Sequence, residues 1–140
     1  MKTFRVRLYD REKDYPMVEE WHHRHGQTAP PAAILPRLGV VAMADGQDCA
    51  GLWLYMDNSV GVCFPEHAVT RPGLGLGEAR GALLRALDFL KTEAETLGYG
   101  LMIINTPRAF ARVLGRAGLF AEVGRDKVTM MGTIKEKQWV

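Results

Sequence analysis

The sequence predicts an α+β domain with a mixed, mostly antiparallel sheet that is flanked by helices. Residues 38–69 read as three strands joined by tight turns, which is typical of an antiparallel meander. A glycine-rich turn and a long amphipathic helix follow in residues 70–97, and a short apolar strand lies at 101–104. A strand–helix–strand crossover of this kind adds a parallel strand to the sheet.

The bulk composition excludes several classes of protein. The 140 residues are 47% hydrophobic and 24% charged, which predicts one folded domain over residues 1–140. A net charge of +2, with scattered basic residues, disfavours a nucleic-acid partner. There is no apolar signal region at the N-terminus and no apolar run near the ~20 residues of a membrane helix. We therefore expect a cytoplasmic protein without a membrane partner.

The first third of the chain predicts a strand, a helix and an irregular connection. Residues 4–9 alternate apolar and polar side chains, which predicts a half-buried strand with a basic outer face and an inner face that ends at Leu8. Asp14 occupies a predicted helix N-cap, with a proline in the first turn, and Gly26 ends the helix. Residues 27–36 are rich in proline and alanine, which favours an ordered irregular connection or a short helical turn.

The central strands contain one residue that breaks their pattern. The apolar run at 38–44 predicts a strand buried on both faces, and the Asp-Gly pair at 45–46 predicts a hairpin turn. Return strands are expected at 49–56 and 60–69. Proline cannot donate to a strand ladder, so Pro65 marks either a bulge or an unpaired edge.

The second half of the chain reads as two helices and three strands. The long helix ends at Gly98, and the all-apolar residues 101–104 predict a buried parallel strand. Thr106 as N-cap, with Pro107 at the first helical position, predicts another helix that ends at Gly118. Two closing strands are expected at 119–123 and 128–134.

A strand that is followed by a glycine-rich turn and a helix often forms an anion-binding site. The first backbone N–H groups of a helix lack partners inside the helix, and the helix dipole favours negative charge there. Gly73, Gly75 and Gly77 let the backbone approach a phosphate closely.

This element order, over nearly all of the chain, resembles the GNAT superfamily of N-acetyltransferases. The Trp-His-rich first helix and the proline-rich second segment are similar to those of its small bacterial and phage members. The resemblance implies acetyl-CoA as cosubstrate and a primary amine as acceptor, and it leaves a homodimer open. It also implies that the strand before the glycine turn splays from its parallel neighbour. Backbone groups of Ala68, Val69 and Thr70 would then pair with the pantetheine arm and polarise the thioester carbonyl.

The pyrophosphate loop of the family can be matched in two frames. The residues from Thr70 to Gly75 fit the pattern [Gln/Arg]-x-x-Gly-x-[Gly/Ala], with threonine in the first position. In the second frame, Arg80 and Gly81 open the helix. A helix from Gly77 to Leu97 would be long against a mean of about 11–12 residues, which favours a helix start nearer Gly81, and both frames stay open.

Another family pattern begins at Asn105 and ends at Gly118. Asn105 would cap the following helix or contact CoA. The family tyrosine that often protonates the leaving thiolate falls on Leu114, which has no proton to donate. Water or another residue would then serve. The alternative is a weakly active or inactive protein that acts as a CoA-binding or protein-interaction module.

Glu66 and His67 are the candidate catalytic residues, because general bases of the family often lie on this strand. The competing interpretations are a surface glutamate and a structural histidine. Trp21 and His25 are assigned to the acceptor pocket, again by resemblance. No metal site is predicted, because no cluster of three or four ligands accompanies the histidines of the first helix. Tyr55 is interpreted as a core or sheet-face aromatic.

Overall fold

The structure, a computed structural model, describes residues 2–118, 120–125 and 130. The chain divides into two compact units, Met1–Ile104 and Asn105–Val140. Among the described residues, the first unit contains the sheet and two α-helices, and the second unit contains one α-helix.

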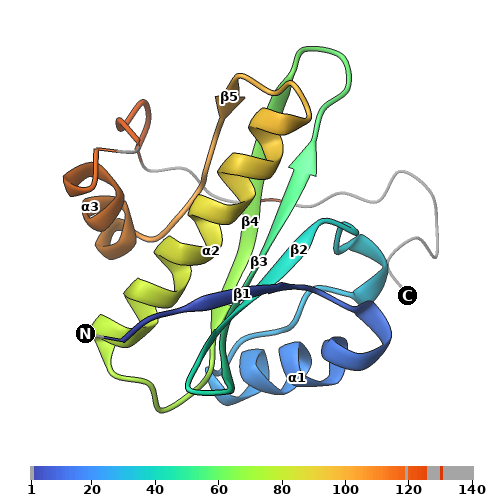
Figure 1. Cartoon of the computed structure of the whole chain (residues 1–140), viewed down its shortest axis with the longest axis vertical. Coiled ribbons are helices and arrows are strands. Elements are labelled where there is room, and N and C mark those ends of the chain that lie inside the picture. Colours follow the sequence, from blue (N-terminus) through green and yellow to red (C-terminus); the bar gives the residue numbers. More distant parts are fainter. Residues whose placement is uncertain (1, 119, 126–129, 131–140) are drawn as a thin grey trace. The chain divides into compact units, whose positions relative to one another are not determined.

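The first unit is built on a sheet with the strand order β1-β2-β3-β4-β5 (Figure 1). Its strands are β1 (Arg5–Leu8), β2 (Gly39–Ala44), β3 (Gln47–Met56), β4 (Val62–Thr70) and β5 (Leu101–Met102). The first four strands pair antiparallel, whereas β4 and β5 pair parallel. The predicted mixed, mostly antiparallel sheet is therefore confirmed.

The hairpin between β2 and β3 follows from its two turn residues. Asp45 and Gly46 have φ angles of 52° and 74°, as a tight two-residue hairpin turn requires. The strand before this turn is almost fully buried, as its continuous apolar run predicts. The proline-rich connection contains the short 3₁₀ turn η1 (Ala32–Ile34), in agreement with the prediction.

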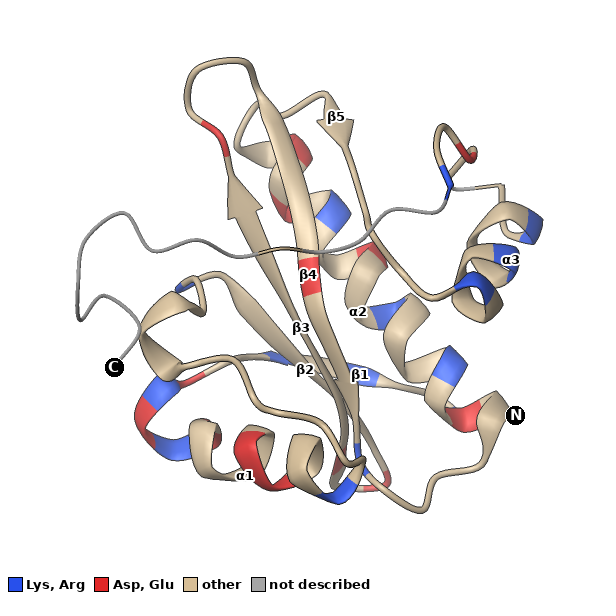
Figure 2. Ribbon diagram, turned by 180° about the vertical axis from the view of Figure 1, so that it is seen from behind, with Lys and Arg blue, Asp and Glu red and all other residues tan. Residues whose placement is uncertain are grey.

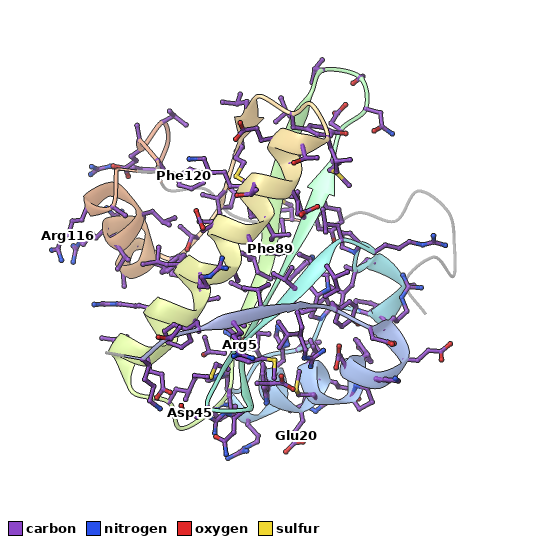
Figure 3. The ribbon with its side chains drawn as sticks, in the orientation of Figure 1. Arg5, Glu20, Asp45, Phe89, Arg116 and Phe120 are labelled. Carbon is purple, nitrogen blue, oxygen red and sulfur yellow. The ribbon has the colours of Figure 1, made fainter. Side chains whose placement is uncertain are left out.

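Helices α1 (Arg11–Arg24) and α2 (Leu76–Thr96) cover the sheet. Val18 and Trp21 of α1 pack in one buried cluster with Trp53 of β3. Helix α2 runs in front of the sheet in Figure 1 and behind it in Figure 2. Both helices carry basic as well as acidic residues (Figure 2), and Glu20 points away from the sheet on the outer side of α1 (Figure 3). No described helix has the length and apolar character needed to cross a membrane.

The start of α1 differs from the prediction. Asp10, not Asp14, is the N-cap, and its side chain accepts hydrogen bonds from the backbone N–H groups of Glu12 and Lys13. Asp14 is buried and receives Arg7 Nη1 at 2.8 Å, so a tertiary partner has taken its carboxylate. Pro16 consequently lies inside the helix and not in its first turn.

The predicted faces of the first strand are confirmed only in part: Phe4 and Val6 are half-buried and Arg5 is exposed, but the pattern fails from Arg7 onward. Leu8 is 62% exposed, whereas Tyr9 is 8% exposed and belongs to the core cluster. Arg7 points inward to the carboxylates of Asp14 and Asp48. The face that reads as basic therefore packs toward α1, because paired carboxylates satisfy its guanidinium.

The C-terminal predictions are only partly confirmed. Leu101 and Ile103 are 57% and 40% exposed, so β5 is not buried; it is two residues long and forms the edge of the described sheet. Helix α3 (Arg108–Arg116) has Pro107, not Thr106, at its N-cap. Of the predicted closing strands, the described residues 120–123 and 130 are not in a strand, and the other residues lie outside the described part.

Candidate functional site

One edge of β4 opens part-way along the strand. Strand β5 pairs with β4 only at Val62 and Cys63, where the Ile103 N–H donates to the Cys63 carbonyl at 2.9 Å. Within the described residues, no strand pairs with this edge beyond Cys63. The backbone groups of successive residues in a strand point alternately to its two edges. Pro65 is two residues after Cys63, so its backbone groups point to the same edge as those of Cys63, toward β5. The N–H that proline lacks would therefore not have bonded to β3. The predicted unpaired edge at Pro65 is confirmed.

The bulge in β4 lies at residues 67–68 and not at Pro65. Glu66 pairs with Trp53 and Val69 pairs with Gly51, so two residues of β4 oppose a single residue of β3. His67 has a φ of 62°, in the left-handed region that few residues other than glycine adopt. An extra residue of this kind reorients the side chains and backbone groups that follow it.

The bulge determines which backbone groups face the open edge. The Arg71 N–H donates to the Cys49 carbonyl of β3 at 2.8 Å. By alternation, the backbone groups of Val69 also face β3, and those of Ala68 and Thr70 face the open edge. Of the three residues that the family resemblance assigned to the pantetheine arm, only Ala68 and Thr70 therefore have backbone groups on the open edge. The Thr70 carbonyl already accepts a hydrogen bond from His25 Nε2 at 2.7 Å.

The bulge also brings His67 to the side of Tyr55. Tyr55 and Trp53 are two residues apart in β3 and share a face, and Glu66, the cross-strand partner of Trp53, lies on it too. His67 Nε2 lies 2.8 Å from Tyr55 Oη, and their rings stand edge to face with centroids 5.7 Å apart. The two candidate bases of β4 are thus on one side of the sheet.

The electrostatic environment keeps this pair neutral. Burial, followed by the negative charge of Glu66, raises the pKa of Tyr55. Burial, followed by the charge of His22, lowers the pKa of His67. Near neutral pH the phenol is therefore protonated and the imidazole is uncharged, the form in which histidine accepts a proton.

Helix α1 places its predicted site residues in two different environments. Trp21 is 5% exposed and belongs to the core cluster. His25 is exposed and reaches the end of β4. His22 is 6% exposed, and its Nδ1 lies 2.9 Å from the Val18 carbonyl, so this nitrogen carries the proton. The described residues contain no group of three or more metal-ligating side chains.

The glycine turn leads to an uncapped helix start. Helix α2 begins at Leu76, and its N-cap Gly75 makes no side-chain capping bond. A Cβ atom at Gly73, Gly75 or Gly77 would meet no other atom within 4 Å, so the backbone here is open to approach. Exposed first-turn N–H groups without a capping side chain suit an anion such as a diphosphate.

The start of α2 differs from the predicted start. The first loop frame, from Thr70 to Gly75, coincides with the turn. The prediction that the helix starts near Gly81 is wrong, because Arg80 and Gly81 lie inside α2. Gly81 has a packing role: a Cβ there would stand 2.7 Å from Cε2 of Phe4. Arg80 is half-buried in the second turn of α2.

The second unit contains the other two residues of interest. Asn105 is exposed at the start of the unit. Leu114 of α3 is 1% exposed, as expected for a residue on the apolar stripe of an amphipathic helix.

Comparison with solved structures shows what this architecture is similar to. The ribosomal-protein-alanine N-acetyltransferase of Brucella melitensis aligns at 17% identity and a TM-score of 0.62, over 93% of this chain and 100% of its own. An aminoglycoside acetyltransferase from an uncultured soil metagenomic sample aligns at 11% identity and a TM-score of 0.64, over 92% and 99%. An aminoglycoside N-acetyltransferase in complex with CoA aligns at 16% identity and a TM-score of 0.59, over 94% and 96%.

This chain has the GNAT fold. No protein-family profile and no curated protein sequence matches it. The GNAT fold was predicted from the order of elements, and the opening of the sheet at β4 was predicted with it. Tyr55 was missed as a site residue, because only the β3–β4 register together with the bulge at His67 reveals it.

Proposed function

We propose that this protein is an N-acyltransferase that moves the acetyl group of acetyl-CoA to a primary amine. The observation that carries the proposal is the open edge of β4, which leads directly into the uncapped start of α2. An extended arm with amide groups fits the first feature, and a diphosphate fits the second. Pantetheine and the CoA pyrophosphate have these two chemistries in this order.

Each part of the cosubstrate has candidate partners on the chain. The open-edge backbone groups of Ala68 and Thr70 would pair with the pantetheine arm and polarise the thioester carbonyl. The pyrophosphate would lie against Gly73, Gly75 and Gly77, with the charge of Arg80 nearby. A solved protein of this fold contains CoA, which supports the choice of cosubstrate.

The reaction is a direct transfer. The amine nitrogen attacks the thioester carbonyl carbon, the new C–N bond forms, and the C–S bond to CoA breaks. The amine gives up a proton to a general base, for which Glu66 and His67 of β4 are the two candidates. Proteins of this fold act on acceptors as different as ribosomal protein and aminoglycosides, by their names, so the acceptor here is proposed only as a primary amine. His25 is proposed to line the acceptor side.

An amine panel tests the proposal. The protein is incubated with acetyl-CoA and peptides, polyamines, amino sugars and aminoglycosides, and both free CoA thiol and acetylated product are measured. We expect product from at least one class of amine in stoichiometric balance with the thiol. Thiol release without acetylated product would indicate hydrolysis only, and release of neither would contradict the proposal.

Leu114 favours one alternative, a CoA-binding protein or interaction module without turnover. In the family pattern this position often carries the tyrosine that protonates the leaving thiolate, and leucine has no such proton. The alternative predicts that acetyl-CoA raises the unfolding temperature while no amine of the panel is acetylated. Acetylation of any panel amine at a rate above the uncatalysed background would exclude it.

A further inference from the structure

The hydroxyl group of Tyr55 lies between two partners and has one proton to share. Its Oη is 2.7 Å from the Ile34 carbonyl oxygen and 2.8 Å from His67 Nε2. A carbonyl oxygen can only accept, so the phenol proton goes to Ile34. Both hydrogen bonds then exist only if the Nε2–H of His67 donates to Tyr55 Oη. If Nδ1 carried the proton instead, one of these two short contacts would have no proton between its atoms.

This arrangement specifies the tautomer of His67. When Nε2 carries the proton of a neutral imidazole, Nδ1 carries the lone pair. Among the described residues, His67 makes no other hydrogen bond, and no donor of this part of the chain is directed at that lone pair. Nδ1 is therefore the atom of the His67 ring that can accept a proton.

We propose that Tyr55 is a positioning residue that holds His67 in the Nε2–H tautomer, so that His67 Nδ1, and not Glu66, takes the proton from the acceptor amine. The inference rests on the proposed N-acyltransferase function for its chemical step. The tautomer itself is a property of the resting protein and stands independently of turnover.

Every proton and bond of the proposed reaction is accounted for. The amine attacks the thioester carbonyl carbon, and its proton moves to His67 Nδ1 as the C–N bond forms. The C–S bond breaks, and the resulting imidazolium gives the proton to the CoA thiolate. One histidine thus performs the step for which the family often uses a separate tyrosine, whose position is occupied here by Leu114.

The local backbone explains why this histidine points to Tyr55. In a regular strand, His67 would face away from Glu66 and from the Tyr55 side. Its left-handed φ of 62° within the bulge turns it to the Tyr55 side instead. The phenol is tied in turn to η1 through the Ile34 carbonyl, so three separate segments of the first unit fix one ring.

Nitrogen-15 NMR of histidine-labelled protein tests the positioning claim without any substrate. The protein has only 4 histidines, and His67→Gln identifies the signal of interest. We expect the neutral His67 ring to show a protonated Nε2 and an unprotonated Nδ1, and Tyr55→Phe to mix the two tautomers. A wild-type ring protonated at Nδ1, or an unchanged tautomer in Tyr55→Phe, would overturn the assignment.

Kinetics on an amine that the protein acetylates test the catalytic claim. Tyr55→Phe should lower kcat about tenfold or more with little change in the KM for acetyl-CoA. Tyr15→Phe is the matched control, because Tyr15 Oη donates to the Pro30 carbonyl of the same connecting segment at 2.9 Å but does not touch His67. His67→Gln should lower kcat about 10²-fold or more, and Glu66→Gln should lower it less. A larger loss in Glu66→Gln would assign the base to Glu66, and equal losses in the two tyrosine variants would show that Tyr55 only tethers the segment.

Discussion

His25 Nε2 lies 2.7 Å from the carbonyl oxygen of Thr70, so the end of helix α1 is fastened to the last residue of β4. Because the glycine turn starts directly after Thr70, this bond fixes the point where the strand passes into the candidate phosphate site. It also occupies the Thr70 carbonyl oxygen, which is one of the backbone acceptors on the open edge.

Removing this bond should weaken cosubstrate binding. We expect His25→Ala to raise the Kd for acetyl-CoA about two- to tenfold, because a single hydrogen bond contributes about 0.5–1.5 kcal/mol. His23→Ala is the control, since His23 is exposed on the same helix and makes no side-chain hydrogen bond among the described residues. Equal affinities of the two variants, measured by calorimetry, would show that the His25 bond does not shape the site.

The ion pair of Arg7 and Asp14 should make stability depend on acid pH. Burial raises the pKa of Asp14, but hydrogen bonds from Arg7 and from the Asp10 N–H outweigh burial, and the net pKa lies below its usual value. A lowered folded-state pKa stabilises the protein above the unfolded value of about 3.9, and this contribution is lost as pH falls through the folded value.

Asp14→Asn should therefore lower the free energy of unfolding near pH 7 by about 2 kcal/mol and flatten its decline below about pH 4. Asp88→Asn is the control, because Asp88 forms only an exposed pair with Arg85 at 3.6 Å. Thermal unfolding across the pH range measures both. A wild-type acid profile in Asp14→Asn would assign the acid sensitivity to other groups.

Gly39 is required by the neighbouring indole. A Cβ atom at this position would overlap the Trp53 ring, which is fully buried and cannot swing aside. We expect Gly39→Ala to destabilise the protein by about 1–3 kcal/mol in urea unfolding. Gly100→Ala, where a Cβ meets nothing within 4 Å, should change stability by less than about 0.5 kcal/mol. Similar losses in both variants would mean that backbone freedom matters here and not the contact.

Local patterns in the sequence were sufficient for most of the fold. The Asp45-Gly46 turn, the long helix and the unpaired edge at Pro65 all follow from the preferences of the residues themselves. The N-cap at Asp14 was mispredicted because a distant residue, Arg7, binds its carboxylate, and a local pattern contains no distant partner.

The site was less accessible to sequence reasoning than the fold. The bulge lies at residues 67–68, where no glycine or proline marks it, so its position could not be read from the sequence. The direction of the His67 side chain, and with it the pairing to Tyr55, depends entirely on the bulge. The loop frame was ambiguous for a similar reason: Gly81 reads as a turn residue, but it serves close packing against Phe4.

The central claim is that acetyl-CoA binds between the open edge of β4 and the start of α2. Calorimetric titration with acetyl-CoA tests it most directly, on the wild type and on two matched glycine variants. Gly75→Asp places a carboxylate at the N-cap, where aspartate is well tolerated and a Cβ has free space, but where it would compete with and repel a diphosphate. Gly100→Ala is the control, because a Cβ there meets nothing within 4 Å and the residue lies outside the glycine turn. We predict that the wild type and Gly100→Ala bind acetyl-CoA with Kd values within about threefold of each other, while Gly75→Asp remains folded and loses at least about tenfold in affinity. No binding to the wild type at millimolar acetyl-CoA, or undiminished binding to Gly75→Asp, would contradict the account.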